Sequence, residues 1–403
     1  MRRREFIAGA AATAALAGAP AIVRAQSATI KIGEINSYTA IPAFTLPYRN
    51  GWQLAVDEIN AAGGVLGRKL EVISRDDAGK PEDAVRLAGE LVNNEKVELL
   101  AGTFLSHIGL AVSDYARQNK IYFMAAEPLS DAVTWAKGHK YCFRLRPSTY
   151  MQAAMLAEEA VKLPAKRWAT VSPNYEYGQS AVKWFKELVQ KKRPDVQFVT
   201  EQWPALGRID AGATVQAVAQ ANPEAIFNVT FGPDLTNFVR QGNTRGLFEG
   251  RAVVSMLTGE PEYLDPLKDE TPEGWIVTGY PWDQIHTPAH KAFREAYQKK
   301  FNDYPRLGSV VGYETFKSIA AAIKKAGSTD AEKLIAATRG LNVDGVFGPY
   351  MFRAVDHQST LGAYVGKTAL KGGKGVMVDW RYADGKNYLP PDDVVRQMRP
   401  DNA

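Results

Sequence analysis

The sequence predicts an α/β fold built from two doubly wound parallel-sheet lobes. Strand and helix patterns alternate from Thr29 to Ala125, which favours a parallel sheet covered by helices on both faces. The same alternation restarts at Tyr141 and continues to Thr278. The chain has 403 residues, more than one hydrophobic core usually organises, so two lobes are expected.

The first alternation reads strand–helix–strand–helix–strand–helix–strand. Alternating or continuous apolar residues predict the strands, and a period near 3.6 residues predicts the helices. A long turn, Ser37–Pro47, is expected to separate the first strand from the first helix. The predicted strands are 29–36, 69–75, 97–101 and 121–125, and the predicted helices are 49–62, 82–93 and 107–118.

The second alternation has the same character, without close sequence repetition. Its predicted strands are 141–145, 167–171, 196–202, 225–229, 252–257 and 274–278, and its helices are 151–162, 179–190, 214–221 and 234–241. Three further helices, 288–302, 310–326 and 331–338, are expected to return to the first lobe. From Asp344 onward the pattern indicates short strands and turns.

The stretch Leu99–Asp114 is the first candidate site. A buried strand runs into Gly102, a short turn follows, and Ser106 stands where the N-cap of the next helix is expected. A helix start with free N–H groups and a positive dipole end binds anions readily. Ser106 either caps its own helix only or also holds a ligand.

The first 25 residues resemble an export signal. Arg3 and Arg4 begin a twin-arginine-like motif, an apolar stretch spans 8–19, and Val23-Arg24-Ala25 fits a cleavage site. The alternative is an uncleaved anchor, but the apolar stretch is too short to span a membrane. The sequence therefore predicts a mature protein outside the cytoplasm, in the periplasm.

Charge and motif content exclude several function classes. The formal net charge is +5, and removing the four arginines and one glutamate of the signal leaves +2, so no nucleic-acid partner is expected. The only cysteine, Cys142, lies in an apolar strand. His286 and His290 are four residues apart, a weak metal signal with Pro288 between them. Neither a nucleophile elbow nor a phosphate-binding loop is present, so the sequence predicts no enzyme, metal or cofactor.

A family resemblance extends over the mature chain. Its strongest segment is Gly51–Pro81, GWQLAVDEINAAGGVLGRKLEVISRDDAGKP, and shorter matches are FRLRPS, YEYG, GYE and FGP. These motifs resemble the leucine/isoleucine/valine-binding type of periplasmic substrate-binding proteins, which serve ABC transporters. The resemblance implies crossings between the lobes near 146–148, 280–283 and 351–356. It divides the chain into a signal (1–25), a first lobe (26–146 with 283–350) and a second lobe (147–282 with 351–403).

The resemblance also implies a set of ligand contacts in the cleft. Ser106 matches a helix-capping serine that binds a carboxylate, and loops ending at Asp234 and Glu260 match those that supply an aromatic residue and an acid. Asp234 alternatively caps a helix, Phe104 and Phe231 alternatively belong to the core, and Tyr175 alternatively lies on a surface loop. The implied contacts are Phe44, Phe104, Leu105, Ser106, Ala126, Glu127, Tyr175, Tyr177, Phe231, Asp234 and Glu260.

Glu127 departs from the family pattern, because a small or hydroxyl residue is usual there. Two like charges about 4 Å apart repel by roughly 1–4 kcal/mol, so Glu127 points away, is protonated or meets a donor on the ligand. The sequence thus predicts a monomeric receptor that captures an amino acid or a small carboxylate, including aromatic acids, and delivers it to an ABC permease. Alternatives are a sensor of amides or small molecules with the same fold and an extracytoplasmic hydrolase.

Overall fold

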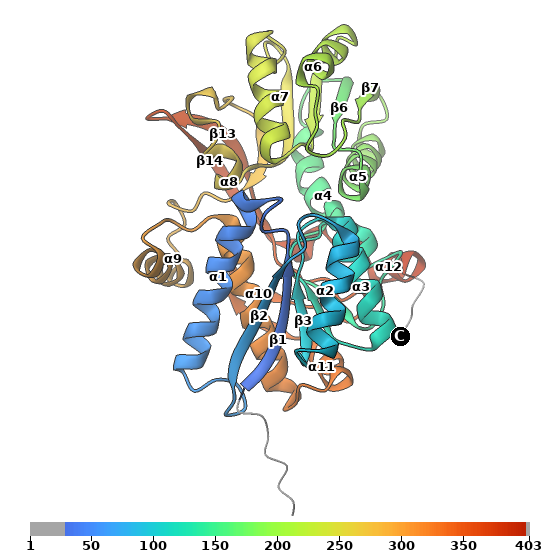
Figure 1. Cartoon of the computed structure of the whole chain (residues 1–403). Coiled ribbons are helices and arrows are strands. Elements are labelled where there is room, and N and C mark those ends of the chain that lie inside the picture. Colours follow the sequence, from blue (N-terminus) through green and yellow to red (C-terminus); the bar gives the residue numbers. More distant parts are fainter. Residues whose placement is uncertain (1–28, 400–403) are drawn as a thin grey trace, which may run out of the picture.

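The structure, a computed structural model, describes residues 29–399. It consists of two α/β bodies stacked end to end, with the blue N-terminal elements in the lower body and the green and yellow elements in the upper one (Figure 1). We call these the first and second lobes. The predicted export signal lies outside the described residues.

The first lobe contains a five-stranded parallel sheet, as the alternation predicts. The strand order is β2-β1-β3-β4-β5, and every neighbouring pair is parallel. The strands are β1 Thr29–Asn36, β2 Lys69–Asp76, β3 Leu99–Gly102, β4 Phe123–Ala125 and β5 Cys142–Arg144, and the helices between them are α1 Pro42–Ala61, α2 Pro81–Asn93 and α3 Ser106–Asn119.

The second lobe contains a seven-stranded sheet in the order β14-β13-β10-β9-β8-β6-β7. Five strands are parallel, and an antiparallel hairpin is added at one edge. The strands are β6 Arg167–Val171, β7 Gln197–Gln202, β8 Ala225–Asn228, β9 Ala252–Gly259, β10 Ile276–Gly279, β13 Ala363–Lys371 and β14 Lys374–Ala383. The helices are α4 Thr149–Ala160, α5 Glu176–Lys192, α6 Ala211–Gln220, α7 Gly232–Thr244 and α8 Pro261–Leu264.

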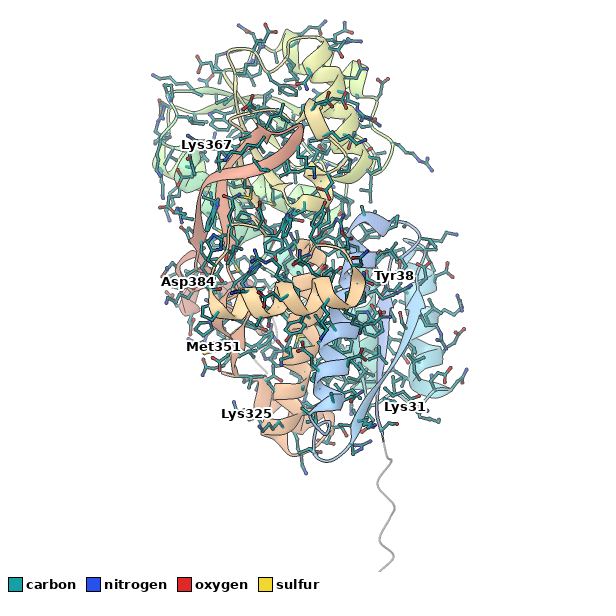
Figure 2. The ribbon with its side chains drawn as sticks, turned by 90° about the vertical axis from the view of Figure 1, so that its left-hand side faces the viewer. Lys31, Tyr38, Lys325, Met351, Lys367 and Asp384 are labelled. Carbon is teal, nitrogen blue, oxygen red and sulfur yellow. The ribbon has the colours of Figure 1, made fainter. Side chains whose placement is uncertain are left out.

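The hairpin of β13 and β14 differs from the short strands expected after Asp344. Its two strands have nine and ten residues and cover the edge of β10. Figure 2 shows this hairpin running from Lys367 on the second lobe down toward Asp384 near the junction of the lobes. An edge strand presents unpaired backbone groups, and the hairpin satisfies those of β10.

Helix α1 begins seven residues earlier than predicted, so Phe44 is helical and the expected long turn is wrong. Pro42 occupies the first turn, where its missing N–H costs no hydrogen bond, and Pro47 lies inside the helix. Phe44 and Tyr48 are fully buried. Burial of these side chains outweighs the one backbone bond that Pro47 removes.

The chain returns to the first lobe after β10, as expected. The returning elements are α9 Pro288–Phe301, α10 Leu307–Ala326, α11 Ala331–Thr338 and the hairpin of β11 Asn342–Gly345 with β12 Gly348–Met351. Helices α1 and α10 lie side by side, with the rings of Trp52 and Phe316 5.5 Å apart (Figure 1).

The chain passes between the sheets after β5, after β10 and after β12. The first and third passages pair with each other, because Arg144 N donates to His357 O at 3.1 Å and Ser359 N donates to Arg144 O at 2.9 Å. The last helix of the described part is α12 Asp392–Met398. Arg399 after it donates to Thr134 O of the first lobe at 2.6 Å. This contact connects the C-terminal segment, which the resemblance places in the second lobe, with the first lobe.

A buried carboxyl in β1 makes the stability of the first lobe depend on pH. Burial raises the pKa of Glu34 to about 8, although hydrogen bonds from Ser74 and Tyr38 oppose the shift. Between the unfolded pKa near ~4.3 and this value, only the folded state retains the proton. The free energy of unfolding therefore decreases as the pH rises through that window, by at most about 1.4 kcal/mol per unit for one group.

Replacing Glu34 by glutamine is expected to flatten this dependence, because an amide does not titrate. Urea unfolding at pH 5 and pH 8 should show a smaller loss of stability for Glu34→Gln than for the wild type. Glu295→Gln on the exposed face of α9 is the control and should behave as the wild type. Equal losses in Glu34→Gln and the wild type would contradict the assignment.

Candidate ligand-binding site

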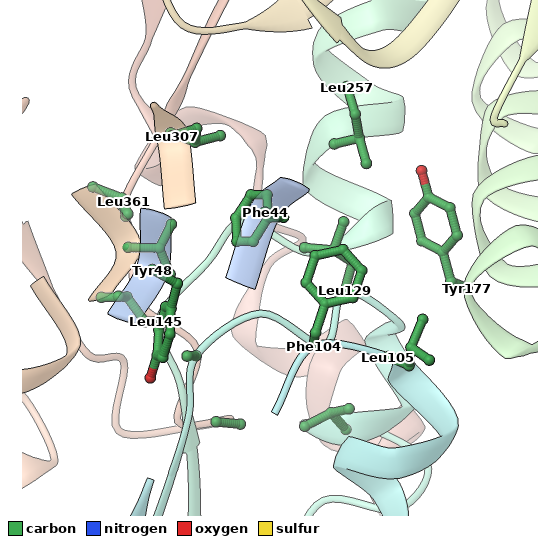
Figure 3. Close-up of a cluster of buried hydrophobic side chains, with 14 of the residues drawn as sticks. Phe44, Tyr48, Phe104, Leu105, Leu129, Leu145, Tyr177, Leu257, Leu307 and Leu361 are labelled. Carbon is green, nitrogen blue, oxygen red and sulfur yellow. The ribbon is translucent and has the colours of Figure 1, made fainter. Parts of the chain in front are cut away.

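A small cavity lies between the lobes. It is closed by rings and aliphatic side chains, several of which converge in Figure 3. Its lining comes from both lobes and from the first passage between them. The lining residues are Phe104, Ser106, Glu127, Leu129, Arg146, Tyr175, Tyr177, Phe231 and Leu257.

Topology explains why these residues meet. Phe104 follows β3, Glu127 follows β4, Tyr175 follows β6 and Phe231 follows β8, so each stands just beyond the carboxyl end of a parallel strand. The carboxyl ends of parallel strands share one edge of a sheet, which is where ligands bind in open α/β sheets. The two such edges face each other across the cavity.

Backbone in the left-handed region occurs at one residue that lines this cavity and at one residue next to its lining. Thr103, next to Phe104, has φ 65°, and Leu257 has φ 71°, although both carry branched side chains. Such conformations cost roughly 1–3 kcal/mol each and cluster at functional sites. The main-chain N–H of Leu257 is held by Thr278 Oγ1 at 2.9 Å.

Ser106 lies one residue inside its helix, so the prediction that it is the N-cap is wrong. Leu105 occupies the N-cap position with extended backbone (φ −70°, ψ 136°) and makes no side-chain cap. Ser106 Oγ instead accepts a hydrogen bond from Ser130 N at 3.1 Å. Its hydroxyl hydrogen and the first-turn N–H groups of α3 remain suited to an anion in the cavity.

Aromatic rings form a continuous wall across the two lobes. The ring of Phe104 lies 5.0 Å from Phe44 and 6.0 Å from Phe231. Tyr177 continues the series at 5.7 Å from Phe231 and 5.9 Å from Tyr175. Phe104 and Phe231 thus belong to the core and to the cavity at once. Phe44 contacts Phe104 but does not line the cavity; both rings are labelled in Figure 3.

One arginine joins both acids of the site. Arg146 Nη1 donates to Glu127 Oε2 at 2.5 Å, and Arg146 Nη2 donates to Glu260 Oε1. All three side chains are buried, with 4% or less exposed. Glu127 follows β4 of the first lobe and Glu260 follows β9 of the second, so the guanidinium connects the lobes. Glu127 Oε1 and Glu260 Oε2 accept no hydrogen bond from any residue of the described range 29–399.

Burial shifts the pKa values of the triad formed by Arg146, Glu127 and Glu260. Burial raises the pKa of Glu127 to about 7, against the opposing effect of Arg146. Burial also raises the pKa of Glu260, with Arg146 again opposing. Burial disfavours the charged form of Arg146, but Glu127 and Glu260 outweigh it and raise its pKa. One guanidinium compensates one carboxylate fully, so the second carboxyl favours its proton.

Three predicted ligand contacts, Asp234, Ala126 and Leu105, do not line the cavity and make hydrogen bonds with backbone groups instead. Asp234 is neither a helix cap nor a cavity residue, because its carboxylate accepts from Gly207 N at 2.7 Å and Ile209 N at 3.2 Å. Ala126 N donates to Gly102 O at 2.9 Å, and Leu105 O accepts from Gly109 N. These positions hold loops in place.

Arg146 is the residue that sequence reasoning missed. It stands in FRLRPS, directly after a buried strand, where an uncompensated cation would be costly. A buried arginine needs acidic partners, and Glu127 was already an unexplained acid. Leu129 and Leu257 were missed as well, since single leucines carry no distinguishing pattern.

A second small cavity lies behind Arg146 at the junction of the passages. Arg146 lines both cavities and stands between them. Glu260 borders this second cavity and not the first. The inner side is apolar, with Val310, Val311 and Phe347 among its lining.

Contacts across both rims hold the lobes together. On one rim Ser130 Oγ donates to Glu176 Oε1 at 2.8 Å. On the other, Gly308 N at the start of α10 donates to Glu262 Oε1 at 2.6 Å, and Asp265 accepts from Tyr304 OH at 2.6 Å. The structure is therefore a closed arrangement of the lobes.

The histidine pair considered as a metal site is not available for one. His290 Nε2 lies 2.6 Å from Tyr280 OH and Nδ1 lies 3.2 Å from Ile285 O. Burial lowers the pKa of His290 to about 4. Within residues 29–399 no three histidine, cysteine or acidic side chains gather closely enough to bind a metal ion.

Comparison with known proteins agrees with this architecture. The periplasmic binding protein family model matches residues 29–374. Leu/Ile/Val-binding protein homolog 7 of Brucella suis is 26% identical over 337 residues, covering 79% of this chain and 82% of that protein. The leucine-, isoleucine-, valine-, threonine- and alanine-binding protein of Pseudomonas aeruginosa is 25% identical over 292 residues, covering 72% and 76%.

A solved structure shares both lobes. The solute-binding protein of an ABC transporter from Rhodopseudomonas palustris BisB5, in complex with 3,4-dihydroxybenzoic acid, superposes with a TM-score of 0.80 at 25% identity. The match covers 89% of this chain and 98% of that one. No helix in the described part, 29–399, is long and apolar enough to cross a membrane. The chain belongs to the periplasmic binding protein family and is a solute-binding protein of the ABC-transporter type.

Proposed function

We propose that this protein captures a small carboxylate, either an amino acid or an aromatic acid, in the cavity between its lobes. The observation that carries the proposal is the start of α3, which opens onto a ring-lined cavity. The first-turn N–H groups and the positive dipole end there suit a carboxylate. The rings of Phe104, Tyr175, Tyr177 and Phe231 suit an apolar or aromatic body.

The relatives support both ligand classes. The Pseudomonas aeruginosa relative is named for five amino acids, and the Rhodopseudomonas palustris neighbour holds 3,4-dihydroxybenzoic acid. Each combines a carboxylate with an apolar or aromatic portion. The cavity offers complementary groups to that combination.

Ligand capture would operate by closure of the lobes. A ligand that contacts both lobes stabilises the closed state relative to the open one. Shifting the population from about 1:99 to 99:1 requires ~5.5 kcal/mol of differential affinity. Two or three hydrogen bonds to charged groups, at roughly 1.5–3 kcal/mol each, are sufficient.

The lobe division completes the proposal. The first lobe would comprise 26–146 with 283–350, and the second 147–282 with 351–391, while α12 returns to the first. The three passages between them would act as hinges. The exported monomer would deliver its ligand to an ABC permease, and no catalytic step is assigned to it.

Isothermal titration calorimetry with amino acids, benzoate and hydroxybenzoates tests the proposal. At least one compound should bind, and small-angle scattering should show a more compact particle on its addition. A panel without binding, together with a scattering profile that no compound changes, would contradict the receptor function.

Replacing Ser106 by alanine is expected to weaken binding of the best ligand by about 1–3 kcal/mol, because one polar contact to the carboxylate is lost. The fold should persist, since only the bond from Ser130 N disappears. Ser113→Ala is the matched control: Ser113 lies in the same helix but bonds His139 away from the cavity. Calorimetry should leave the affinity of Ser113→Ala unchanged. Equal affinity in Ser106→Ala and the wild type would remove Ser106 from the site.

A further inference from the structure

We propose that Arg146 serves as an internal cation that determines the charge class of the ligand. Its guanidinium occupies the space between Glu127 and Glu260, so the cavity selects aromatic carboxylates without an ammonium group over the corresponding amino acids. The inference rests on the proposed function and narrows it.

Arg146 is held from several directions. Its N–H donates to Ala126 O at 3.3 Å, and its carbonyl accepts from Gln358 Nε2 at 3.0 Å. The guanidinium lies 5.3 Å from the centre of the Phe44 ring, within cation–π range. With both carboxylates added, the side chain is fixed at each end. A ligand therefore meets this cation in place rather than displacing it.

The charges of the triad leave little need for a second cation. Arg146 already donates to one oxygen of Glu127 and one of Glu260. An ammonium group entering the buried site would lose its hydration, which costs several kcal/mol per ion, and would stand close to the guanidinium. The same two carboxyls would have to compensate both cations. A ligand without an ammonium group avoids that cost.

The unpartnered oxygens indicate what the ligand presents instead. Among residues 29–399, Glu127 Oε1 is buried and accepts no hydrogen bond, and the hydroxyl of Tyr177, which lines the same cavity, is also buried and without a partner. A neutral hydroxyl satisfies such groups with a smaller loss of hydration than a charged group. A ring that carries both a carboxylate and a hydroxyl matches the start of α3, the ring wall and these oxygens together.

Matched pairs of ligands test the inference on the wild-type protein. The pairs are 3-phenylpropanoate with phenylalanine, and 3-(4-hydroxyphenyl)propanoate with tyrosine, which differ only in the ammonium group. Calorimetry at pH 7.5 should give at least tenfold tighter binding for the acid in each pair, and the hydroxylated acid should bind best. Equal or tighter binding of the amino acids would overturn the inference while leaving the receptor function standing. Absence of binding by all four, with leucine and benzoate also inert, would overturn both.

Substitutions connect the preference to Arg146. Arg146→Met removes the internal cation, so the ratio of acid to amino-acid affinity should fall at least tenfold. Glu127→Gln preserves shape and removes one negative charge, so the same ratio should rise. Arg306→Met is the matched control, because Arg306 pairs with Asp265 across the rim and outside the cavity. It should weaken both members of each pair equally. Ratios unchanged in Glu127→Gln, or unchanged in a folded Arg146→Met, would contradict the role of Arg146.

Discussion

Replacing Gly312 by alanine is expected to destabilise the first lobe by more than about 3 kcal/mol. A Cβ at Gly312 would stand 2.1 Å from Tyr48 O and 2.9 Å from Trp52 N, both backbone atoms of α1. Backbone in a packed helix cannot move aside as a side chain can, so α1 and α10 would have to separate. Urea unfolding followed by circular dichroism should show the loss.

The loss of stability should be specific to glycines at which α1 and α10 approach each other closely. Gly51 and Gly308 also bring α1 and α10 into backbone contact, because a Cβ would stand 1.9 Å from Ser309 O and 2.4 Å from Phe44 O, respectively. The control is Gly89→Ala in α2, where a Cβ would meet nothing nearer than Tyr115 OH at 4.0 Å. That variant should be as stable as the wild type or gain up to ~1 kcal/mol. Similar stabilities for Gly312→Ala and Gly89→Ala would contradict the prediction.

Replacing Arg144 by methionine is expected to cost about 3 kcal/mol or more, because each buried acceptor left without a donor costs roughly 1–3 kcal/mol. Arg144 is fully buried, and its guanidinium donates to Gln358 Oε1 at 2.6 Å, to Thr134 Oγ1 at 3.1 Å and to the carbonyls of Pro128 and Ser130. Methionine fills similar volume but leaves these acceptors buried without donors. Denaturant unfolding measures the loss.

The hydrogen-bond partners of Arg144 lie near the cleft, so the substitution should also affect ligand binding. Gln358 belongs to the third passage between the lobes and Ser130 to the rim of the cleft. Ligand binding should therefore weaken along with stability. Arg86→Met is the control, since Arg86 lies exposed on α2 and pairs with Asp83 and Glu90 of its own helix. A stability of Arg144→Met within 1 kcal/mol of Arg86→Met would show that these bonds contribute little.

The periodic parts of the chain were predictable from sequence because their signals are local. The strand and helix alternation determined two α/β lobes, and most predicted elements agree with the observed ones within a few residues. The start of α1 was missed, because two prolines indicate a turn locally while Phe44 and Tyr48 gain their stability from burial against distant segments. The length of β14 depends in the same way on its pairing with β13.

The cavity could be predicted in part. Phe104, Ser106, Glu127, Tyr175, Tyr177 and Phe231 all line it, whereas Asp234 supports a loop and Phe44 contacts another ring. Asp234 lies close to a lining residue in the sequence, and Phe44 contacts one in space, but both side chains contact the protein itself. Only their side-chain direction distinguishes them from the others, and direction depends on neighbours far away in the sequence.

Local sequence determined the α/β class, the order of the elements and the placement of polar and aromatic residues after the strands, because periodicity and turn chemistry act over a few residues. Tertiary structure alone decided that Arg146 joins Glu127 and Glu260, which lie 19 and 114 positions away. The energy of such a triad arises from burial and proximity together. Neither exists until the two lobes and the passage between them come together.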